Sequence, residues 1–584
     1  MYHSVLKMSA RGPAPTGLLL GLFAGLALAA GPSPPPDAAG LIPLPGVRVT
    51  LLAPRDLAGR PEIVALAAAL DRAAAEMAPR VGGLERAEVP PLTVEVAPDY
   101  PAQGRDTGRI GAAVPGVRTD LVIVYAPADL FADRFALAQA LVRRAGVAAP
   151  PALLRGAALW LAGDWYGRPY REWLPLFAAA RALPAAAELL ADPDPADGSE
   201  LLSTPAAAAV VERLPGATVA RKLSRPPTPA AVAAVLVDLA RGSAAAPVAP
   251  PARLPFWKGV SLAMLNSLDG GYHAPGVGDR LDRLRRLGAD AVSLMPFAFQ
   301  EARDRPRLAF VHRRPQGETD AGLVHAARLA RARGMRVLWK PHVWVGGDGW
   351  PGMVAMGSEA DWAAWWAAYR RYVLHHAFLA RWAGADLFSV GCELSRTVPR
   401  SVEWRELIAA VRALFPGAVT YASNWGSDLD QVTFWDRLDY VGVDAYDPLA
   451  ASPAASRADL ARGAAALADR FAAIARRTGK PVLLTEVGFA ARRGAWVAPH
   501  QEGGDYSEAD QATAYDVLLA ALDRRPWLAG TFLWKAFSGG EERWGERPDF
   551  RFLGRRAERV IAGYYGGKAG DQAVGQAGGR AGDR

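Results

Sequence analysis

Two glutamates carry the strongest chemical signal in the sequence. Glu393 follows the apolar run 387–392, and Glu486 ends the run 482–486. Packing gives no reason for a carboxylate at the end of a buried strand, so each glutamate forms either a structural ion pair or part of a reactive site. Hydrolysis of a glycosidic bond needs two carboxyl groups, one on each side of that bond. The two glutamates therefore predict this chemistry, with two unrelated salt bridges as the alternative.

The elements that would position the glutamates are short apolar runs that alternate with amphipathic helical stretches. Eight strand-like runs lie between Phe256 and Tyr565, at 259–266, 291–297, 336–344, 387–393, 419–425, 440–446, 482–489 and 530–537. Such repeated βα units predict an α/β fold with a (β/α)8 TIM barrel at 256–565. An open doubly wound sheet is the alternative, but no Gly-rich phosphate loop follows the first run.

In such a barrel the active site lies at the carboxyl ends of the strands, where several polar and aromatic side chains are expected. Strand alternation places Glu393 on one face with Ser389 and Gly391, and Glu486 on one face with Leu484, so both point to the barrel mouth. Sugar recognition needs aromatic faces and hydrogen-bonding groups, and Trp344 and Trp350 would extend the cleft. We expect substrate to be bound by Asn266, Lys340, His342, Asn424, Trp425, Asp444, Tyr446 and Trp534.

The motifs around these glutamates resemble those of clan A glycoside hydrolases, most closely glycoside hydrolase family 113. The resemblance rests on VGCELS at 390–395 and LTEVGF at 484–489, supported by KPHV at 340–343 and VDAY at 443–446. It implies a retaining β-1,4-mannan hydrolase, with Glu393 as acid/base and Glu486 as nucleophile, about 5–5.5 Å apart. It also implies that Tyr446 contacts the nucleophile and that Trp534 supports the sugar. A hydrolase of another β-glycan, such as a bacterial exopolysaccharide, and a non-catalytic glycan-binding barrel are the alternatives.

Cys392 departs from the pattern of the clan. Many clan A families place Asn directly before the acid/base glutamate, where it contacts the sugar 2-hydroxyl. A thiol is a weak hydrogen-bond donor, so Asn424 or His342 would take that role, or the substrate differs. Cys392 is also the only cysteine of the chain, which excludes an intramolecular disulfide and a Cys-based zinc site.

The first 255 residues predict an export signal and a smaller α/β accessory domain. A basic start, an apolar stretch and the small residues Ala27 and Ala29 predict a signal peptide at 1–30, and hence a secreted or periplasmic protein. An uncleaved membrane anchor is the alternative; after cleavage no membrane insertion is expected. The other predicted units are a linker at 31–46, the accessory domain at 47–225, a linker with a short helix at 226–255 and a disordered tail at 566–584.

The helical part of the accessory domain, 135–165, faintly resembles the core of gluzincin metallopeptidases. The zinc-ligand positions hold other residues, for example Gln139, Arg143 and Arg155, so the resemblance implies a degenerate scaffold without metal or proteolysis. An unrelated α/β domain is the alternative. No metal and no cofactor are expected anywhere in the chain. The net charge of +8 is spread over 584 residues, which argues against nucleic acid and leaves a polysaccharide or oligosaccharide as the expected partner.

Overall fold

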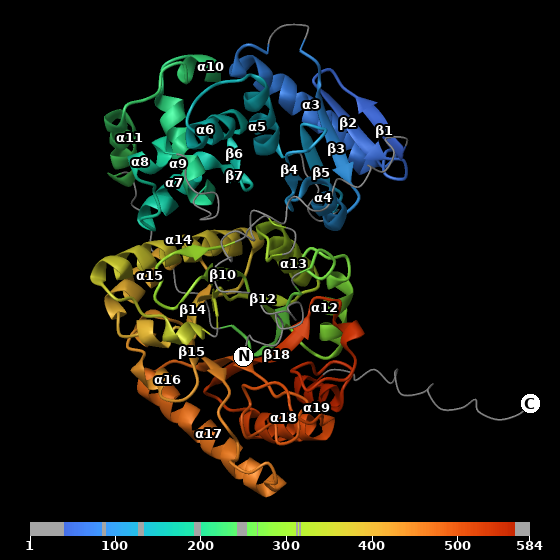
Figure 1. Ribbon diagram of the computed structural model, residues 1–584, viewed down its shortest axis with the longest axis vertical. Coiled ribbons are helices and arrows are strands. Elements are labelled where there is room, and N and C mark those ends of the chain that lie inside the picture. Colours follow the sequence, from blue (N-terminus) through green and yellow to red (C-terminus); the bar gives the residue numbers. More distant parts are fainter. Residues whose placement is uncertain are drawn as a thin grey trace, which may run out of the picture.

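The computed structural model describes residues 40–84, 89–126, 133–191, 200–241, 254–265, 267–310, 314, 317–347 and 349–566. The predicted signal peptide, Asn266 and the tail beyond Gly566 lie outside these residues. Figure 1 shows the N-terminal domain above the barrel domain, with α13 and α14 on the side of the barrel that faces it. Among the described residues, no helix has the length and apolar character needed to cross a bilayer.

The N-terminal domain begins with a five-stranded sheet in the order β1-β2-β3-β5-β4. The inner strands are parallel and the edge strands β1 and β4 are antiparallel, and β1 lies within the range expected to be a linker. Alternate residues of β2 are buried, as in a strand with one face on the core. The elements are β1 Leu41–Pro45, β2 Val49–Pro54, α3 Pro61–Val81, β3 Leu92–Ala97, α4 Tyr100–Thr107, β4 Ala113–Val114 and β5 Leu121–Val124.

Helices make up most of the rest of this domain. The helix α6 packs on α5 and α9, and Gly156 of α6 lies so close to the Ala207 backbone that a Cβ there would clash. The elements are α5 Arg134–Arg144, α6 Pro151–Ala162, β6 Asp164–Trp165, β7 Arg168–Pro169, α7 Tyr170–Ala179, α8 Ala186–Leu190, α9 Glu200–Arg213, α10 Val219–Lys222 and α11 Pro229–Arg241.

The second domain is a closed barrel of eight parallel strands, which confirms the predicted fold. The strands follow one another around the barrel in chain order, and nearly all of their residues are buried because helices cover the outside. The strands are β8 Trp257–Ala263, β9 Ala291–Leu294, β12 Arg336–Trp339, β14 Leu387–Cys392, β15 Ala418–Asn424, β16 Val441–Ala445, β17 Val482–Val487 and β18 Leu528–Phe537. The helices are α12 Val277–Arg286, α13 Asp320–Ala332, α14 Glu359–Ala383, α15 Ser401–Leu414, α16 Asp428–Gln431, α17 Arg457–Thr478, α18 Glu508–Leu522 and α19 Arg556–Tyr565.

The third predicted strand, 336–344, is divided in two. The barrel strand β12 ends at Trp339, and β13 (His342–Val345) leaves the barrel to pair with β10 (Phe297–Gln300), which also pairs with β11 (Leu308–Ala309). Pro341 stands at the break, where it has no N–H to donate to a ladder. This small outer sheet forms one wall of the barrel mouth.

Aromatic side chains join the two domains. Tyr166 of the N-terminal domain packs edge-on against Phe378 and Trp382 of α14, with ring centroids 5.0 and 4.5 Å apart. Trp173 and Phe177 of α7 also contact Phe378, at 4.7 and 5.7 Å. Because Phe378 is fully buried, the interface is part of the hydrophobic core.

We therefore expect Phe378→Ala to lower the free energy of unfolding by about 3–5 kcal/mol, as for other buried Phe→Ala changes. Guanidinium unfolding followed by circular dichroism measures this. Val402→Ala on α15 is the control, because Val402 is exposed, and it should change the free energy by less than about 0.5 kcal/mol. Equal midpoints for the two variants would contradict an energetically important interface.

Candidate active site

Glu393 and Glu486 both lie at the carboxyl-terminal mouth of the barrel, and both are almost fully buried, at 5% and 2% exposure. Glu486 lies in β17, and Glu393 is the first residue after β14. Glu393 adopts a left-handed backbone conformation, with φ of 54°. This conformation is strained for a residue other than glycine, and strained residues are concentrated at functional sites.

Glu486 is held by hydrogen bonds to both of its carboxylate oxygens. Lys340 Nζ donates to Oε1 at 2.6 Å, and the Tyr446 hydroxyl donates to Oε2 at 2.8 Å. Lys340 comes from the loop between β12 and β13, and Tyr446 directly follows β16. A carboxylate fixed in this way has one orientation, which is what a nucleophile needs.

Asp444 lies behind this pair and is fully buried. Lys340 Nζ donates to its two oxygens at 2.8 and 3.0 Å, and the Thr485 hydroxyl and Cys392 thiol donate at 2.8 and 3.2 Å. Burial raises the pKa of the Cys392 thiol well above its usual range, so the thiol stays a neutral donor. Asp444 thus fixes Lys340 and has no surface exposed to a ligand.

Among the described residues, one side chain donates to the Glu393 carboxyl group, since Trp350 Nε1 lies 3.0 Å from its Oε2. Burial raises the pKa of Glu393, and the negative charges of Asp444 and Glu486 raise it further. Burial and Asp444 also raise the pKa of Glu486, but Lys340 and Tyr446 oppose that rise. These contacts favour ionisation of Glu486 over ionisation of Glu393, which is the order that a general acid at Glu393 would require.

His342 lies beside Glu486, with its Nε2 3.9 Å from Glu486 Oε1 and its ring packed on Phe297 at 4.9 Å between centroids. Burial, followed by the Lys340 charge, lowers the pKa of His342 well below its usual value. The imidazole is therefore neutral, and it can act as a hydrogen-bonding group without adding charge to the site.

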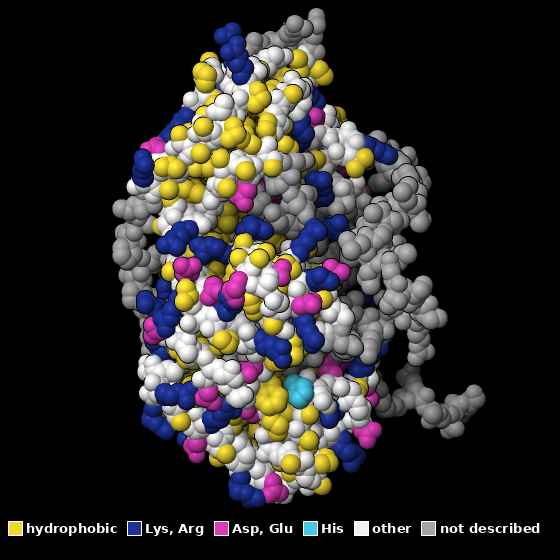
Figure 2. Space-filling view, turned by 60° about the vertical axis from the view of Figure 1, so that its left-hand side comes forward, with side chains coloured by type: hydrophobic (Ala, Val, Ile, Leu, Met, Phe, Trp, Pro, Cys, Tyr) yellow, Lys and Arg dark blue, Asp and Glu magenta, His cyan; other side chains and the backbone are white. Residues whose placement is uncertain are grey.

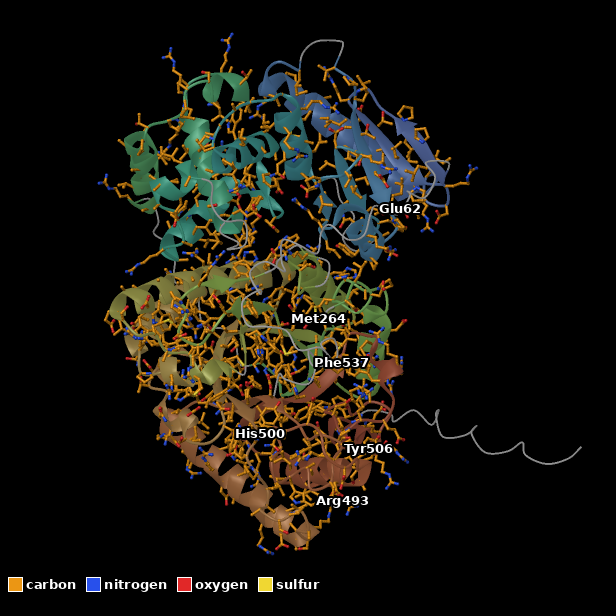
Figure 3. All side chains as sticks on the ribbon, viewed as in Figure 1. Glu62, Met264, Arg493, His500, Tyr506 and Phe537 are labelled. Carbon is orange, nitrogen blue, oxygen red and sulfur yellow. The ribbon has the colours of Figure 1, made fainter. Side chains whose placement is uncertain are left out.

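The other predicted residues line the mouth. Trp534 is buried with Tyr446, Phe550 and Met295 in one apolar cluster, against which Trp425 packs. The Asn424 amide donates to Asp428 at 3.1 Å, at the end of β15. The loop after β17 reaches the same region, because His500 stacks on Trp425 at 5.6 Å. Figure 3 shows His500 below Met264 and Phe537, which lie at the ends of β8 and β18.

Two groups of side chains could hold a metal ion, with ligand atoms within 4.8 Å of one another among the described residues. The first consists of Asp320, His375 and His376, where His375 Nε2 lies 2.8 Å from Asp320 Oδ1. The second consists of His342, Cys392 and Glu486. The Lys340 ammonium already binds Glu486 there and would repel a second cation.

Lys340→Met is expected to lower kcat and to move the acidic limb of the pH–rate profile to higher pH. With Glu486 as the nucleophile, the active form carries this group ionised, so activity is lost as the pH falls through the pKa of Glu486. Removing the ammonium raises that pKa, because a favourable charge is lost. The profile of kcat/KM against pH measures the shift. Lys258→Met is the matched control, since Lys258 binds the Tyr565 carbonyl far from the site.

Sequence reasoning missed how several of these residues are connected. Trp350 was expected only to extend the cleft, yet it donates directly to Glu393. Asp444 and Lys340 were expected to contact sugar, yet they form a buried ion pair next to Glu486. A Lys within a largely apolar run of the sequence was the available signal, because a buried ammonium requires a carboxylate partner.

A family model matches the barrel domain. The model of Glycoside Hydrolase Family 113 matches residues 264–541, which span the barrel from the end of β8 to beyond β18. The chain is thus a glycoside hydrolase enzyme, and the family match does not extend to the N-terminal domain. No curated protein matches the chain.

Solved structures of two proteins described as family 113 enzymes are similar to the barrel. A β-mannanase from Alicyclobacillus acidocaldarius is 27% identical, with a TM-score of 0.49 over 54% of this chain and 98% of that one. A second protein described as a β-1,4-mannanase is 26% identical, with a TM-score of 0.48 over 54% and 100% of the two chains.

Proposed function

We propose that the barrel hydrolyses β-1,4-mannan-type chains with retention of anomeric configuration. The observation that carries this proposal is the asymmetry of the two carboxyl groups. Lys340 and Tyr446 donate hydrogen bonds to Glu486 and favour its ionised form. Burial and the charges of Asp444 and Glu486 raise the pKa of Glu393 and favour its protonated form. The mannan preference comes from the family-type motifs at 390–395 and 484–489.

The reaction would proceed in two displacements. Glu486 Oε attacks the anomeric carbon while Glu393 gives its proton to the departing glycosidic oxygen, which leaves a glycosyl ester on Glu486. Glu393, now a carboxylate, takes a proton from water as that water attacks the same carbon and frees Glu486. Trp534 supplies an apolar surface beside the nucleophile, and neutral His342 supplies a hydrogen-bonding group.

The test is hydrolysis of a panel of β-linked glycans, followed by proton NMR of the first product. Release of reducing ends from mannan, with the β-anomer formed first, is the expected result. The α-anomer formed first would contradict double displacement. Release only from another glycan, such as cellulose, xylan or a bacterial exopolysaccharide, would keep the mechanism and replace the substrate.

A further inference from the structure

The N-terminal domain contacts the barrel at two separate places. At the first, Tyr166 packs on Phe378 and Trp382, which lie in the last two turns of α14. The helices of such a barrel run antiparallel to its strands, so the end of α14 lies near the amino ends of the strands, far from Glu393 and Glu486. The second contact is made by α4, which Figure 1 shows at the edge of the N-terminal domain that faces α13.

The α4 contact is centred on Tyr100, the first residue of the helix, which is only 4% exposed. Its ring packs edge-on against His273, with centroids 6.4 Å apart, and against His325 of α13 at 5.4 Å. Tyr100 also belongs to an apolar cluster of the N-terminal domain, against which Leu268 of the barrel packs. His273 and Leu268 lie in the loop 267–275, which follows β8 at the carboxyl end of the barrel strands. The N-terminal domain therefore reaches the side of the barrel that carries the active site.

Charged pairs at the edge of the domain interface contribute less than this packing. Arg105 of α4 lies 3.9 Å from Asp269, and Arg181 lies 3.8 Å from Glu406, with all four side chains exposed. Figure 2 shows that Lys, Arg, Asp and Glu side chains are spread in the same mixed way over the visible face of the barrel domain. Exposed pairs of this kind stabilise a protein little. Tyr100 is thus the residue through which α4 can hold the loop.

The loop after β8 is also fixed by hydrogen bonds within the barrel domain. The hydroxyl of Ser538, which directly follows β18, donates to the Gly270 carbonyl at 2.6 Å. His273 closes the loop from within, since its Nε2 donates to the Leu268 carbonyl at 2.8 Å. The imidazole that closes the loop is the same one that packs on Tyr100, so loss of the tyrosine ring would leave this closure without its support.

Tyr272 connects the loop with the apolar cluster of the active site. Its hydroxyl accepts a hydrogen bond from the Met295 N–H at 3.2 Å. Met295 is fully buried and packs in one cluster with Trp534 and Tyr446. The Tyr446 hydroxyl in turn donates to Glu486 at 2.8 Å. A shift of the loop would therefore be transmitted through packed groups to the side chains around the proposed nucleophile.

We infer that Tyr100 of the N-terminal domain is a positioning residue for the active site of the barrel. It fixes the conformation of loop 267–275, and the loop positions Met295 together with Trp534 and Tyr446. The inference rests on the proposed function, since it takes these two aromatic residues to serve glycoside hydrolysis. It makes the N-terminal domain, which lies outside the family match, an integral part of the catalytic unit.

The experiment compares Tyr100→Ala with Tyr166→Ala in the full-length protein. Both changes remove an aromatic ring from the domain interface, but Tyr100 contacts the loop at the barrel mouth, whereas Tyr166 contacts the far end of α14. Hydrolysis of β-1,4-mannan is measured at a temperature at which circular dichroism shows both variants folded. We expect kcat to fall about 10-fold or more in Tyr100→Ala and to stay within about twofold of wild type in Tyr166→Ala, because small misplacements of reacting groups are costly. Tyr100→Phe keeps the ring and should recover most of the activity.

Hydrogen exchange followed by mass spectrometry tests the positioning without any substrate. The amides of loop 267–275 should exchange faster in Tyr100→Ala than in the wild type, and at the wild-type rate in Tyr166→Ala. If Tyr100→Ala does not fold, Tyr100→Leu, which keeps an apolar side chain, replaces it in both comparisons.

Two outcomes would overturn the inference. The first is an unchanged kcat in Tyr100→Ala, whether or not the exchange of the loop changes. The second is an equal loss of kcat in Tyr100→Ala and Tyr166→Ala, because the effect would then come from the stability of the interface. Wild-type protein that hydrolyses no mannan would overturn the proposed function instead, and the exchange rates alone would then decide whether Tyr100 fixes the loop.

Discussion

Glu486→Gln is expected to reduce kcat on mannan by on the order of 10⁴-fold or more, because the amide cannot form the glycosyl ester. The neutral amide keeps the size of the side chain and can still accept a hydrogen bond from Lys340 or Tyr446. Loss of activity would therefore report on chemistry and not on unfolding. Reducing-end release and circular dichroism of the same sample measure the two separately.

A control variant and a labelling experiment that detects the glycosyl ester directly complete this test. Glu76→Gln removes a half-exposed carboxylate that pairs with Arg134 in the N-terminal domain, and it should leave kcat within about twofold of wild type, because surface pairs contribute little. A 2-deoxy-2-fluoro mannosyl fluoride should label the wild-type protein once, on the peptide that contains Glu486. A label elsewhere, or activity of Glu486→Gln within tenfold of wild type, would assign the nucleophile to another residue.

The barrel could be predicted from the sequence because its signal is regular. Buried parallel strands give continuous apolar runs, and the helices between them give amphipathic ones. The third strand was predicted as one run because 336–344 is apolar around Lys340 and His342. Pro341 divides it, and the second half joins a separate small sheet whose pairing partner, β10, lies some 40 residues earlier in the sequence.

The position of Glu393 and Glu486 at strand ends of the barrel could also be predicted, since a carboxylate at the end of an apolar strand is a local signal. The orientation of their side chains could not be predicted from the alternation of residues along the strands alone. The register of β14 with β15 shifts between Ser389 and Cys392, and Glu393 turns into a left-handed conformation. Irregularities of this kind reorient side chains next to active sites, and they depend on pairing with neighbouring strands.

The buried hydrogen-bond network next to Glu486 could not be predicted from the sequence, for the same reason. Lys340, Asp444 and Cys392 come from three strand ends that are more than 50 residues apart in sequence, and nothing local shows that they meet. The structure also gives Cys392 a partner. The thiol donates to Asp444 and so takes part in fixing Lys340, which accounts for a residue that the sequence analysis had left as a departure from the clan pattern.

Glu393→Gln is expected to lower kcat on mannan by about 10²–10⁴-fold, the usual contribution of a general acid. Glutamine can keep the hydrogen bond from Trp350, yet it has no proton to give to the leaving oxygen. A 2,4-dinitrophenyl mannoside has a leaving group that departs without a proton, so the first displacement should remain fast on it. The second displacement needs Glu393 as a base, so dinitrophenol should appear in a burst followed by slow turnover.

The pH profile separates this role of Glu393 from a purely structural one. In the wild type the active form carries a proton on Glu393, so activity is lost as the pH rises through the pKa of that group. Burial and the charges of Asp444 and Glu486 raise this pKa, which keeps the enzyme active near neutral pH, where an ordinary carboxyl group would be ionised. Glutamine does not titrate, so the basic limb should disappear in the variant while the acidic limb, set by Glu486, remains. A variant that keeps both limbs of the pH profile would show that Glu393 is not the acid. Loss of the dinitrophenol burst together with mannan hydrolysis would show the same, because a leaving group that needs no proton does not depend on a proton donor.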